Sequence, residues 1–131
     1  MPDAAASEPP AGDAPKPPAG DAAAALAWLG EMSPDLRAAA ILDGDGEVLA
    51  ADGDPERWRE DAAGLFRVAD AAGAEPVEGV HVATEQGEVF ALRHAGLAAV
   101  AVTERFALAS LLLFDLRATL RDLARAREAA A

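Results

Sequence analysis

Apolar and polar residues alternate along this chain with two periods, one typical of helices and one typical of strands. From Asp21 to about Met32 the apolar side chains fall on one side of a helix, and Asp21 is a suitable N-cap. Ser33-Pro34-Asp35 ends this segment, because a proline disfavours helical geometry in the residue before it. The pattern therefore predicts a first helix over about residues 21–32.

The next segment carries the signals of a β-hairpin. Two apolar runs, Arg37–Asp43 and Glu47–Ala51, flank Gly44-Asp45-Gly46. Asp-Gly between two apolar runs is the strongest short-range indication of a hairpin. We therefore expect two antiparallel strands here.

A second helix is predicted from Asp54-Pro55-Glu56, which supplies an N-cap, a proline at the first helical position and an early acid. Apolar residues then recur at helical spacing, and Gly73 is a typical helix end. These apolar positions are Trp58, Ala62, Leu65, Phe66, Ala69 and Ala72.

Three short extended runs and a long amphipathic segment complete the chain. The runs are Val80–Thr84, Val89–Arg93 and Leu97–Thr103, separated by turns at Gln86-Gly87 and at His94-Ala95-Gly96. The last segment, from Phe106 to about Arg127, has the apolar spacing of a helix. Its apolar positions are Phe106, Ala109, Leu113, Leu116, Leu120 and Leu123.

The predicted element order is α-β-β-α-β-β-β-α. Because the links between consecutive strands are short, the strands within each group should pair antiparallel. Ala38–Leu42 and Leu97–Val102 are apolar on both faces, which requires helices on both sides of the sheet. We therefore predict the α/β (α+β) class, as a three-layer α/β/α sandwich with a five-stranded, mostly antiparallel sheet.

The first 20 residues differ in composition from the rest of the chain. They hold most of the nine prolines, together with Ala, Gly and Asp, and have little apolar surface to bury. We expect residues 1–20 to form a disordered tail, either a passive leader or a docking peptide, and residues 21–131 to form one domain.

The stretch Ala39–Ala50, a strand that ends in Asp and turns through Gly into a second strand, resembles the first hairpin of the Roadblock / dynein light chain family. The capped helix from Asp54 follows at the distance seen in that family. Leu97–Thr103, running into the last helix, is similar to the final unit of the family. Where family members often have Asn-Leu-Gly near the start of that helix, this chain has Ala107–Ser110.

The resemblance implies a dimer and a protein partner. In this family the strand after the second helix pairs with its copy, and bacterial members bind small Ras-like GTPases on the surface formed by the second helices. Carried onto this chain, self-association would use strand 80–84 and helix 55–72. The corresponding dimer residues are Val80, His81, Val82, Ala83 and Thr84. The partner-binding residues on the helix are Trp58, Arg59, Ala62, Leu65, Phe66 and Ala69.

Charge and composition narrow the classes of partner. The chain has 23 acidic and 11 basic residues, a formal net charge of −12, so neither nucleic acid nor an anionic membrane surface is an expected partner. It has no cysteine, no signal-peptide pattern at its start and no apolar run long enough to span a bilayer. We expect a cytoplasmic protein.

No catalytic or cofactor motif is present in the sequence. Asp43, Asp45 and Glu47 suggest a calcium loop, but the glycine and glutamate that an EF-hand requires at its sixth and twelfth positions are missing, so a hairpin turn is favoured. His81 and His94 lack metal-site spacing, and neither a serine elbow nor a P-loop occurs. We therefore expect no enzyme activity, no metal and no cofactor.

Some features leave alternatives open. Arg117, Arg121 and Arg125 form a basic stripe on the last helix, either a solvated face or a partner site. Trp58 and Phe66 fit core packing or an interface. The expected function is a dimeric module that regulates or scaffolds a small Ras-like GTPase. The alternatives are a small-molecule sensor of profilin-like or PAS type, against which the alanine-rich strands argue by close packing, and a structural subunit of a larger complex.

Overall fold

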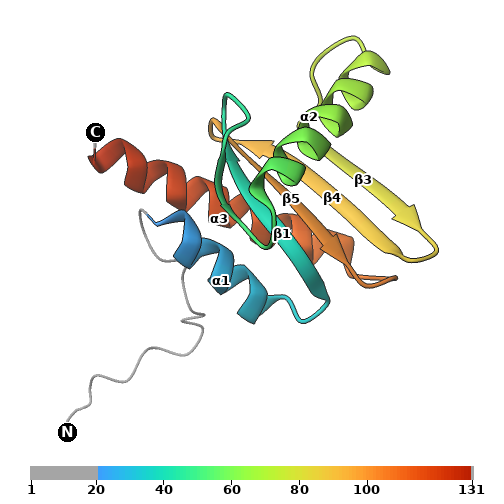
Figure 1. Ribbon diagram of the computed structural model, residues 1–131, viewed down its shortest axis with the longest axis horizontal. Coiled ribbons are helices and arrows are strands. Elements are labelled where there is room, and N and C mark those ends of the chain that lie inside the picture. The colour runs from blue at the N-terminus through green and yellow to red at the C-terminus, as the bar shows by residue number, and fades with distance from the viewer. Residues whose placement is uncertain (1–20, 131) are drawn as a thin grey trace, which may run out of the picture.

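Three helices and five strands follow the predicted order in the computed structural model, which describes residues 21–130 (Figure 1). The predicted disordered tail, residues 1–20, lies outside the described residues. The elements are α1 (Ala22–Met32), β1 (Leu36–Asp43), β2 (Val48–Ala51), α2 (Pro55–Ala71), β3 (Gly79–Thr84), β4 (Gly87–His94), β5 (Leu97–Thr103) and α3 (Ala109–Ala130).

The five strands form one antiparallel sheet in the order β2-β1-β5-β4-β3. The pairing of β1 with β5, which sets Ala39 opposite Ala101, joins the two ends of the domain at the centre of the sheet. Both strands are largely buried, as expected for strands that are apolar on both faces. The small side chains of these strands let helices approach the sheet closely from either side.

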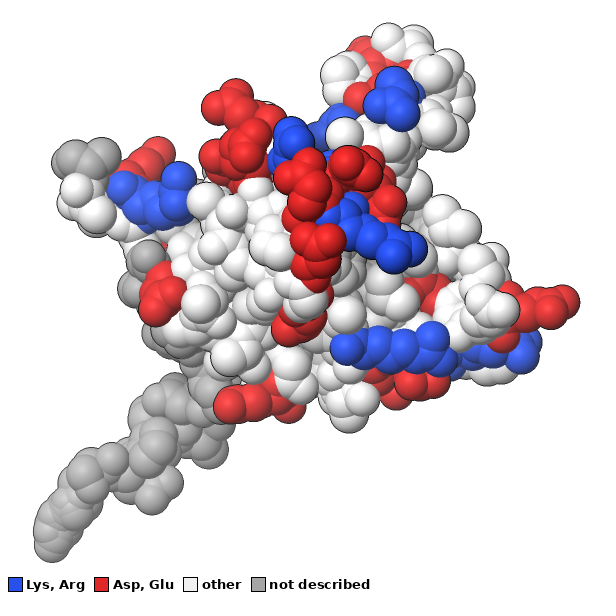
Figure 2. All heavy atoms as spheres, in the orientation of Figure 1, with Lys and Arg blue, Asp and Glu red and all other residues white. Residues whose placement is uncertain are grey.

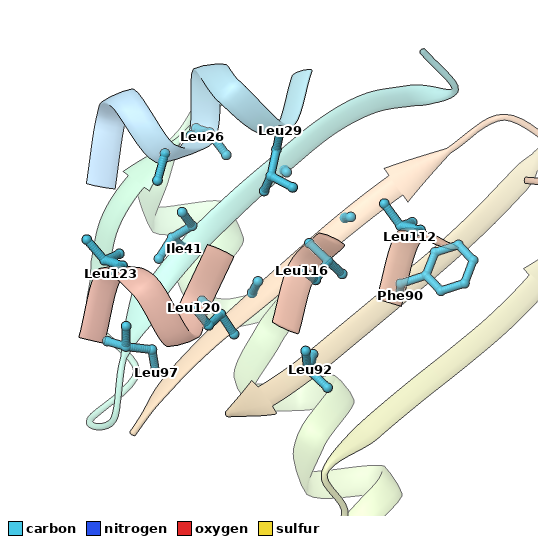
Figure 3. Packing of buried hydrophobic residues seen from close by; sticks show 14 residues of the cluster. Leu26, Leu29, Ile41, Phe90, Leu92, Leu97, Leu112, Leu116, Leu120 and Leu123 are labelled. Atoms are coloured by element: carbon cyan, nitrogen blue, oxygen red, sulfur yellow. The ribbon is translucent and has the colours of Figure 1, made fainter. Parts of the chain in front are cut away.

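Two helices cover one face of the sheet, and the third covers the other, which confirms the three-layer sandwich. Figure 3 shows leucines of α1 and α3 pointing toward the same strands. Because the largest side chains between these helices and the sheet are almost fully removed from water, this layer carries most of the hydrophobic stabilisation. Its largest buried residues are Leu29, Ile41, Phe90, Leu92, Leu116, Leu120 and Leu123.

The layer beneath α2 is thinner. Only Ala62 and Phe66 of this helix are buried, and they meet the alanine-rich face of β1, β4 and β5. Trp58 and Leu65 are half-buried at the margin of the same cluster. The two faces of the sheet are therefore packed to different depths.

Local signals in the sequence act as predicted. The Asp21 carboxylate accepts hydrogen bonds from the backbone N–H groups of Ala23 and Ala24, at 2.9 and 3.3 Å, and Asp54 caps α2 in the same way. In the β1–β2 turn the Asp43 carboxylate accepts the N–H groups of Asp45 (2.9 Å) and Glu47 (3.0 Å). Asp43 thus acts as a turn residue in this structure.

The ends of two helices differ from the prediction. α3 begins at Ala109, and Phe106 precedes it with a φ of 62° and an exposed side chain. The prediction failed because Phe106 continues the apolar spacing of the helix but belongs to the loop. α2 ends at Ala71, with Ala72 in a right-handed conformation, so Gly73 does not supply a left-handed cap. No helix of the described chain is long and apolar enough to cross a bilayer.

Candidate protein-binding surface

β3 forms one edge of the sheet, and all five residues predicted for the dimer interface lie on it. Val80, Val82 and Thr84 share the sheet face with α2, whereas His81 and Ala83 share the face with α3. Val80 is half-buried and the other four residues are exposed. Val82, 39% exposed, is one of the few large apolar side chains of the described chain that face solvent.

The free side of β3 presents backbone groups that no other strand of the described chain reaches. Thr84 pairs with Gly87 across a two-residue turn, so residues with even numbers exchange hydrogen bonds with β4. The N–H and C=O groups of His81 and Ala83 therefore point away from the sheet. Such a row of donors and acceptors is a template for a further strand.

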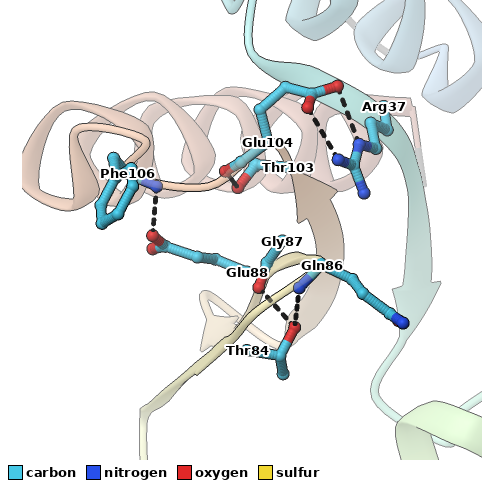
Figure 4. Close-up of polar contacts among 8 residues, drawn as sticks. All are labelled: Arg37, Thr84, Gln86, Gly87, Glu88, Thr103, Glu104 and Phe106. Carbon is cyan, nitrogen blue, oxygen red and sulfur yellow. Dashed lines mark hydrogen bonds and ion pairs between the residues drawn. The ribbon is translucent and has the colours of Figure 1, made fainter.

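A hydrogen-bonded chain ties β3 to the loop that precedes α3. His81 Nε2 lies 2.7 Å from Glu88 Oε1, and Glu88 Oε2 accepts the backbone N–H of Phe106 at 2.6 Å (Figure 4 shows the second bond). The imidazole also stacks on Phe90, with ring centroids 4.3 Å apart. The hydrogen bond from His81 and that from Phe106 lower the pKa of the buried Glu88, although desolvation opposes them.

The same end of the sheet is fixed by two further contacts, also visible in Figure 4. Arg37 makes two hydrogen bonds to Glu104, at 2.8 and 2.7 Å, and Thr84 Oγ1 donates to the Gly87 carbonyl at 2.8 Å. A Cβ at Gly87 would lie 2.4 Å from the Thr103 carbonyl oxygen, so only glycine fits there. The β3 edge is therefore held in a fixed position relative to β4 and β5.

The residues predicted for partner binding on α2 have different environments. Ala62 and Phe66 are core residues, and Leu65 and Ala69 are half-buried. The outward side of the helix instead presents Ala63, Arg67 and Val68, none of which was singled out from the sequence; Val68 is 69% exposed.

The first turns of α2 are tied to their surroundings by polar contacts. The indole N–H of the half-buried Trp58 donates to the Asp52 carbonyl at 2.6 Å. Arg59 is exposed and pairs with Glu56 (2.6 Å) and more weakly with Glu47 (3.9 Å). Figure 2 shows acidic and basic side chains intermixed over α2, so this face has no single charge sign.

A half-buried arginine connects α2 to the sheet. The Arg93 guanidinium lies 4.1 Å from the centre of the Phe66 ring, donates to both Asp70 oxygens (3.1 and 2.8 Å) and reaches the Val77 carbonyl at 3.0 Å. The hydrogen bond from Arg93 and the one from the Val77 N–H lower the pKa of Asp70. These contacts fix the position of α2 and of the loop that leads into β3.

An open cleft of about 690 Å³ lies between α2 and the turns at one end of the sheet. Its floor includes Leu42, Phe66 and Ala98, and Arg67 stands at its rim. This cleft contradicts the expectation that alanine-rich strands leave no cavity. The reason is that α2 covers only part of its sheet face, so the small side chains are left partly without a neighbour. Within residues 21–130, no three His, Asp or Glu side chains converge as metal ligands would.

Solved structures with a similar architecture include a Roadblock/LC7 domain from Streptomyces avermitilis, with a TM-score of 0.65 and 23% identity over 77% of this chain and 92% of that one. The chain has the Roadblock/LC7 fold. An MglB with a tetrameric arrangement gives a TM-score of 0.59 and 20% identity, over 81% of this chain and 87% of that one. LokiProfilin2, in a complex with rabbit actin, gives a TM-score of 0.56 and 16% identity, over 76% of this chain and 92% of that one. No protein-family model and no curated protein matches the sequence.

Two polar groups that organise this Roadblock/LC7 fold were missed from the sequence. Glu88 and Arg93 are charged residues of β4, and they flank a run of four apolar residues from Val89 to Leu92. Their partners lie seven and 23 residues away, in His81 and Asp70. A charged residue within an otherwise buried strand was the available signal, because such a group requires a partner when it is removed from water.

Proposed function

We propose that this chain is a dimeric protein-interaction module that regulates or scaffolds a small Ras-like GTPase. The observation that supports it best is the β3 edge, which is exposed and contains no Asp, Glu, Lys or Arg. The outward side of α2 is exposed as well. The GTPase comes from the resemblance to bacterial Roadblock proteins.

Self-association through β3 is favoured by the charge of the strand. The chain carries a net charge of −12, which opposes contact between two copies. Gly79–Thr84 contains no Asp, Glu, Lys or Arg, so two antiparallel copies can pair without bringing like charges together. The resulting sheet would run continuously through both copies, with Val82 of each covered by the other.

Association would also place the two α2 helices on the same face of the joined sheet. Their outward side chains, including Arg67 and Val68, would then form one platform. In this proposal the platform holds the GTPase and positions the GTPase's own catalytic loops, and no arginine of this chain enters the reaction.

The dimer is tested with Ala83→Pro. Proline removes an N–H that points away from β4, so the fold should remain while strand pairing between copies is lost. Ala83→Thr keeps the N–H and is the matched control. Light scattering should give a monomer for Ala83→Pro and a dimer for Ala83→Thr. A dimer for both variants would contradict pairing through β3.

The GTPase is tested by binding to each small Ras-like GTPase of the same genome, purified and loaded with GDP or with a non-hydrolysable GTP analogue. Binding of one of them should depend on the nucleotide and should weaken with Arg67→Glu. Arg127→Glu, the same charge change on α3, is the control. Absence of nucleotide-dependent binding in every case would contradict this part of the proposal.

The cleft favours a second candidate, a small-molecule sensor. Its volume lies within the range of ligand sites, and Arg67 makes no ion pair with any residue in 21–130. A metabolite that raises the melting temperature of the chain, but not that of Ala98→Leu, would support this candidate. Because leucine at residue 98 would fill the floor of the cleft, equal shifts for both proteins would exclude the cleft as the site.

A further inference from the structure

Large apolar side chains are exposed on the α3 side of the molecule, across the sheet from α2. They lie in the loop before α3 and in its first two turns, and more than half of each side chain faces solvent. These residues are Phe106 (81% exposed), Leu108 (65%), Leu111 (53%) and Phe114 (65%). Apart from Val68 and Val82, they are the exposed large apolar residues of the described chain. A cluster of this kind marks an interaction site more often than chance.

The outward side of α3 continues this cluster toward the C-terminus. The core-facing positions are Leu112, Leu116, Leu120 and Leu123. Since a helix turns by about 100° per residue, Phe114 points directly away from that core-facing side. Positions at steps of three and four residues from Phe114 share its direction. They are Leu111, Ala118, Arg121 and Arg125, and we call this set with Phe114 the outer stripe.

The outer stripe is apolar in its first half and basic in its second. Arg121 is exposed and pairs only with its neighbour Asp122, at 3.1 Å. Arg125 makes no ion pair with any residue between 21 and 130. Arg117 lies beside the stripe and contacts Glu78 at 3.5 Å. On a chain with 23 acidic and 11 basic residues, these arginines form a local concentration of positive charge, in which Arg125 has no acidic partner within residues 21–130.

Two possible occupants fit this pattern poorly. In an antiparallel contact between two copies of α3, the apolar half of one would meet the basic half of the other; in a parallel contact, arginines would face arginines. Residues 1–20 carry Asp3, Glu8 and Asp13, but they contain no Leu, Ile, Val or aromatic residue to cover Leu111 and Phe114.

We infer that the outer stripe binds an acidic amphipathic helix of another protein. The apolar side chains of that helix would cover Leu111 and Phe114, and its carboxylates would reach Arg121 and Arg125. This surface is separated from α2 by the whole sheet, so both can be occupied at once. The inference does not depend on the proposed GTPase or on the dimer.

Two designed peptides of about five helical turns test the inference against the full chain. They have leucines at identical positions, and the remaining positions carry Glu in one and Lys in the other. Fluorescence anisotropy should show saturable binding of the Leu/Glu peptide, weakened by added salt, and weaker binding of the Leu/Lys peptide.

Variants of the chain locate the binding. Phe114→Ser, and separately the double change Arg121→Glu with Arg125→Glu, should each weaken the Leu/Glu peptide roughly tenfold or more. Arg127→Glu changes the charge on the side of α3 away from the stripe, and Val68→Ser removes an exposed apolar residue from α2; both should leave binding unchanged. All five substituted positions are exposed, so unchanged melting temperatures would show that folding is intact.

Three results would overturn the inference. One is no saturable binding of the Leu/Glu peptide up to about 1 mM. Another is equal or tighter binding of the Leu/Lys peptide. The third is equal loss of binding in Phe114→Ser and Val68→Ser, which would indicate general hydrophobic adhesion without a defined site.

Discussion

The two edges of the sheet differ in how far the fold itself covers them. β2, at one edge, is four residues long, and all of its residues are half-buried between α1 and α2. β3, at the other edge, is six residues long, and five of its residues are exposed. The pairing of β2 with β1 also has an irregularity. Just beyond β2, Asp52 exchanges two hydrogen bonds with Ala39, at 2.9 and 3.0 Å.

The β2 edge is closed within one chain, whereas the β3 edge stays open to a further strand, as the proposed dimer requires. Short length, a bulge and covering helices are the means by which proteins close a sheet edge, and β2 has all three. Charged residues and prolines are further means, and β3 has none of them. Changes in β2 should therefore affect the stability of one chain, whereas changes in β3 should affect the contact between chains.

The largest effect is expected from Val82→Lys. Each copy would bring a lysine to the shared edge, which loses apolar contact and adds like charge. We expect the dissociation constant of the dimer to rise by about a hundredfold or more, as measured by sedimentation velocity. Glu85→Lys, in the exposed turn beyond the strand, is the control and should leave the dimer intact. Equal weakening by both changes would mean that general charge, and not the β3 edge, controls association.

A smaller effect, of a different kind, is expected at β2. Leu49 is half-buried against the core cluster to which α1 and α3 contribute, so Leu49→Ala should reduce the free energy of unfolding by about 2 kcal/mol. The dimer should persist. Leu108→Ala, at an exposed residue, should change stability by less than about 0.5 kcal/mol. Denaturant titrations at one protein concentration measure both, and loss of the dimer in Leu49→Ala would erase the distinction between the edges.

Asp52 gives a finer test of how β2 is closed. Asp52→Ala leaves the Ala39 N–H without its carboxylate partner and should reduce stability by about 1 kcal/mol. Asp52→Asn keeps an acceptor oxygen and should lose less. Thermal unfolding distinguishes them, and equal losses would show that the charge of Asp52 matters and its hydrogen bond does not.

The smallest effect is a pH dependence near the β3 edge. A carboxyl whose pKa is lower in the folded chain stabilises the fold above its unfolded pKa, about 4.3 for Glu. For Glu88, Asp70 and Glu104 that stability is lost as the pH falls through their folded pKa values. Burial raises the pKa of Asp115, so the contribution of this residue to the stability of the fold increases as the pH falls. The melting temperature should fall below about pH 4.3, less steeply in Glu88→Gln. An unchanged slope in that variant would contradict the role given to His81 and Phe106.

Much of the fold could be predicted because its signals are local. The Asp-Gly turn, the caps at Asp21 and Asp54 and the spacing of apolar residues act within a few positions, and the structure places the elements within a few residues of the prediction. The side-chain cap of Asp54 also explains why the start of α2 was predicted better than its end, where Gly73 supplies no left-handed cap.

The remaining features depend on contacts that periodicity does not record. The hydrogen bond from the Phe106 N–H to Glu88 and the ion pair of Arg93 with Asp70 join residues 18 and 23 positions apart. The cleft depends on how much of a sheet face α2 covers, which is a matter of tertiary packing. The exposure of Phe106 and Phe114 also escapes the sequence, because an apolar residue on the outward side of a helix reads like one in the core.

Hydrogen exchange at the backbone amides of His81 and Ala83 tests most directly whether β3 pairs with a second copy. Both N–H groups point away from β4, so only an added strand can protect them. If β3 pairs with a second copy, these two amides should be strongly protected and the protection should decrease on dilution, while the amides of Val80 and Val82 stay protected throughout. Fast exchange at His81 and Ala83 at every protein concentration would contradict it.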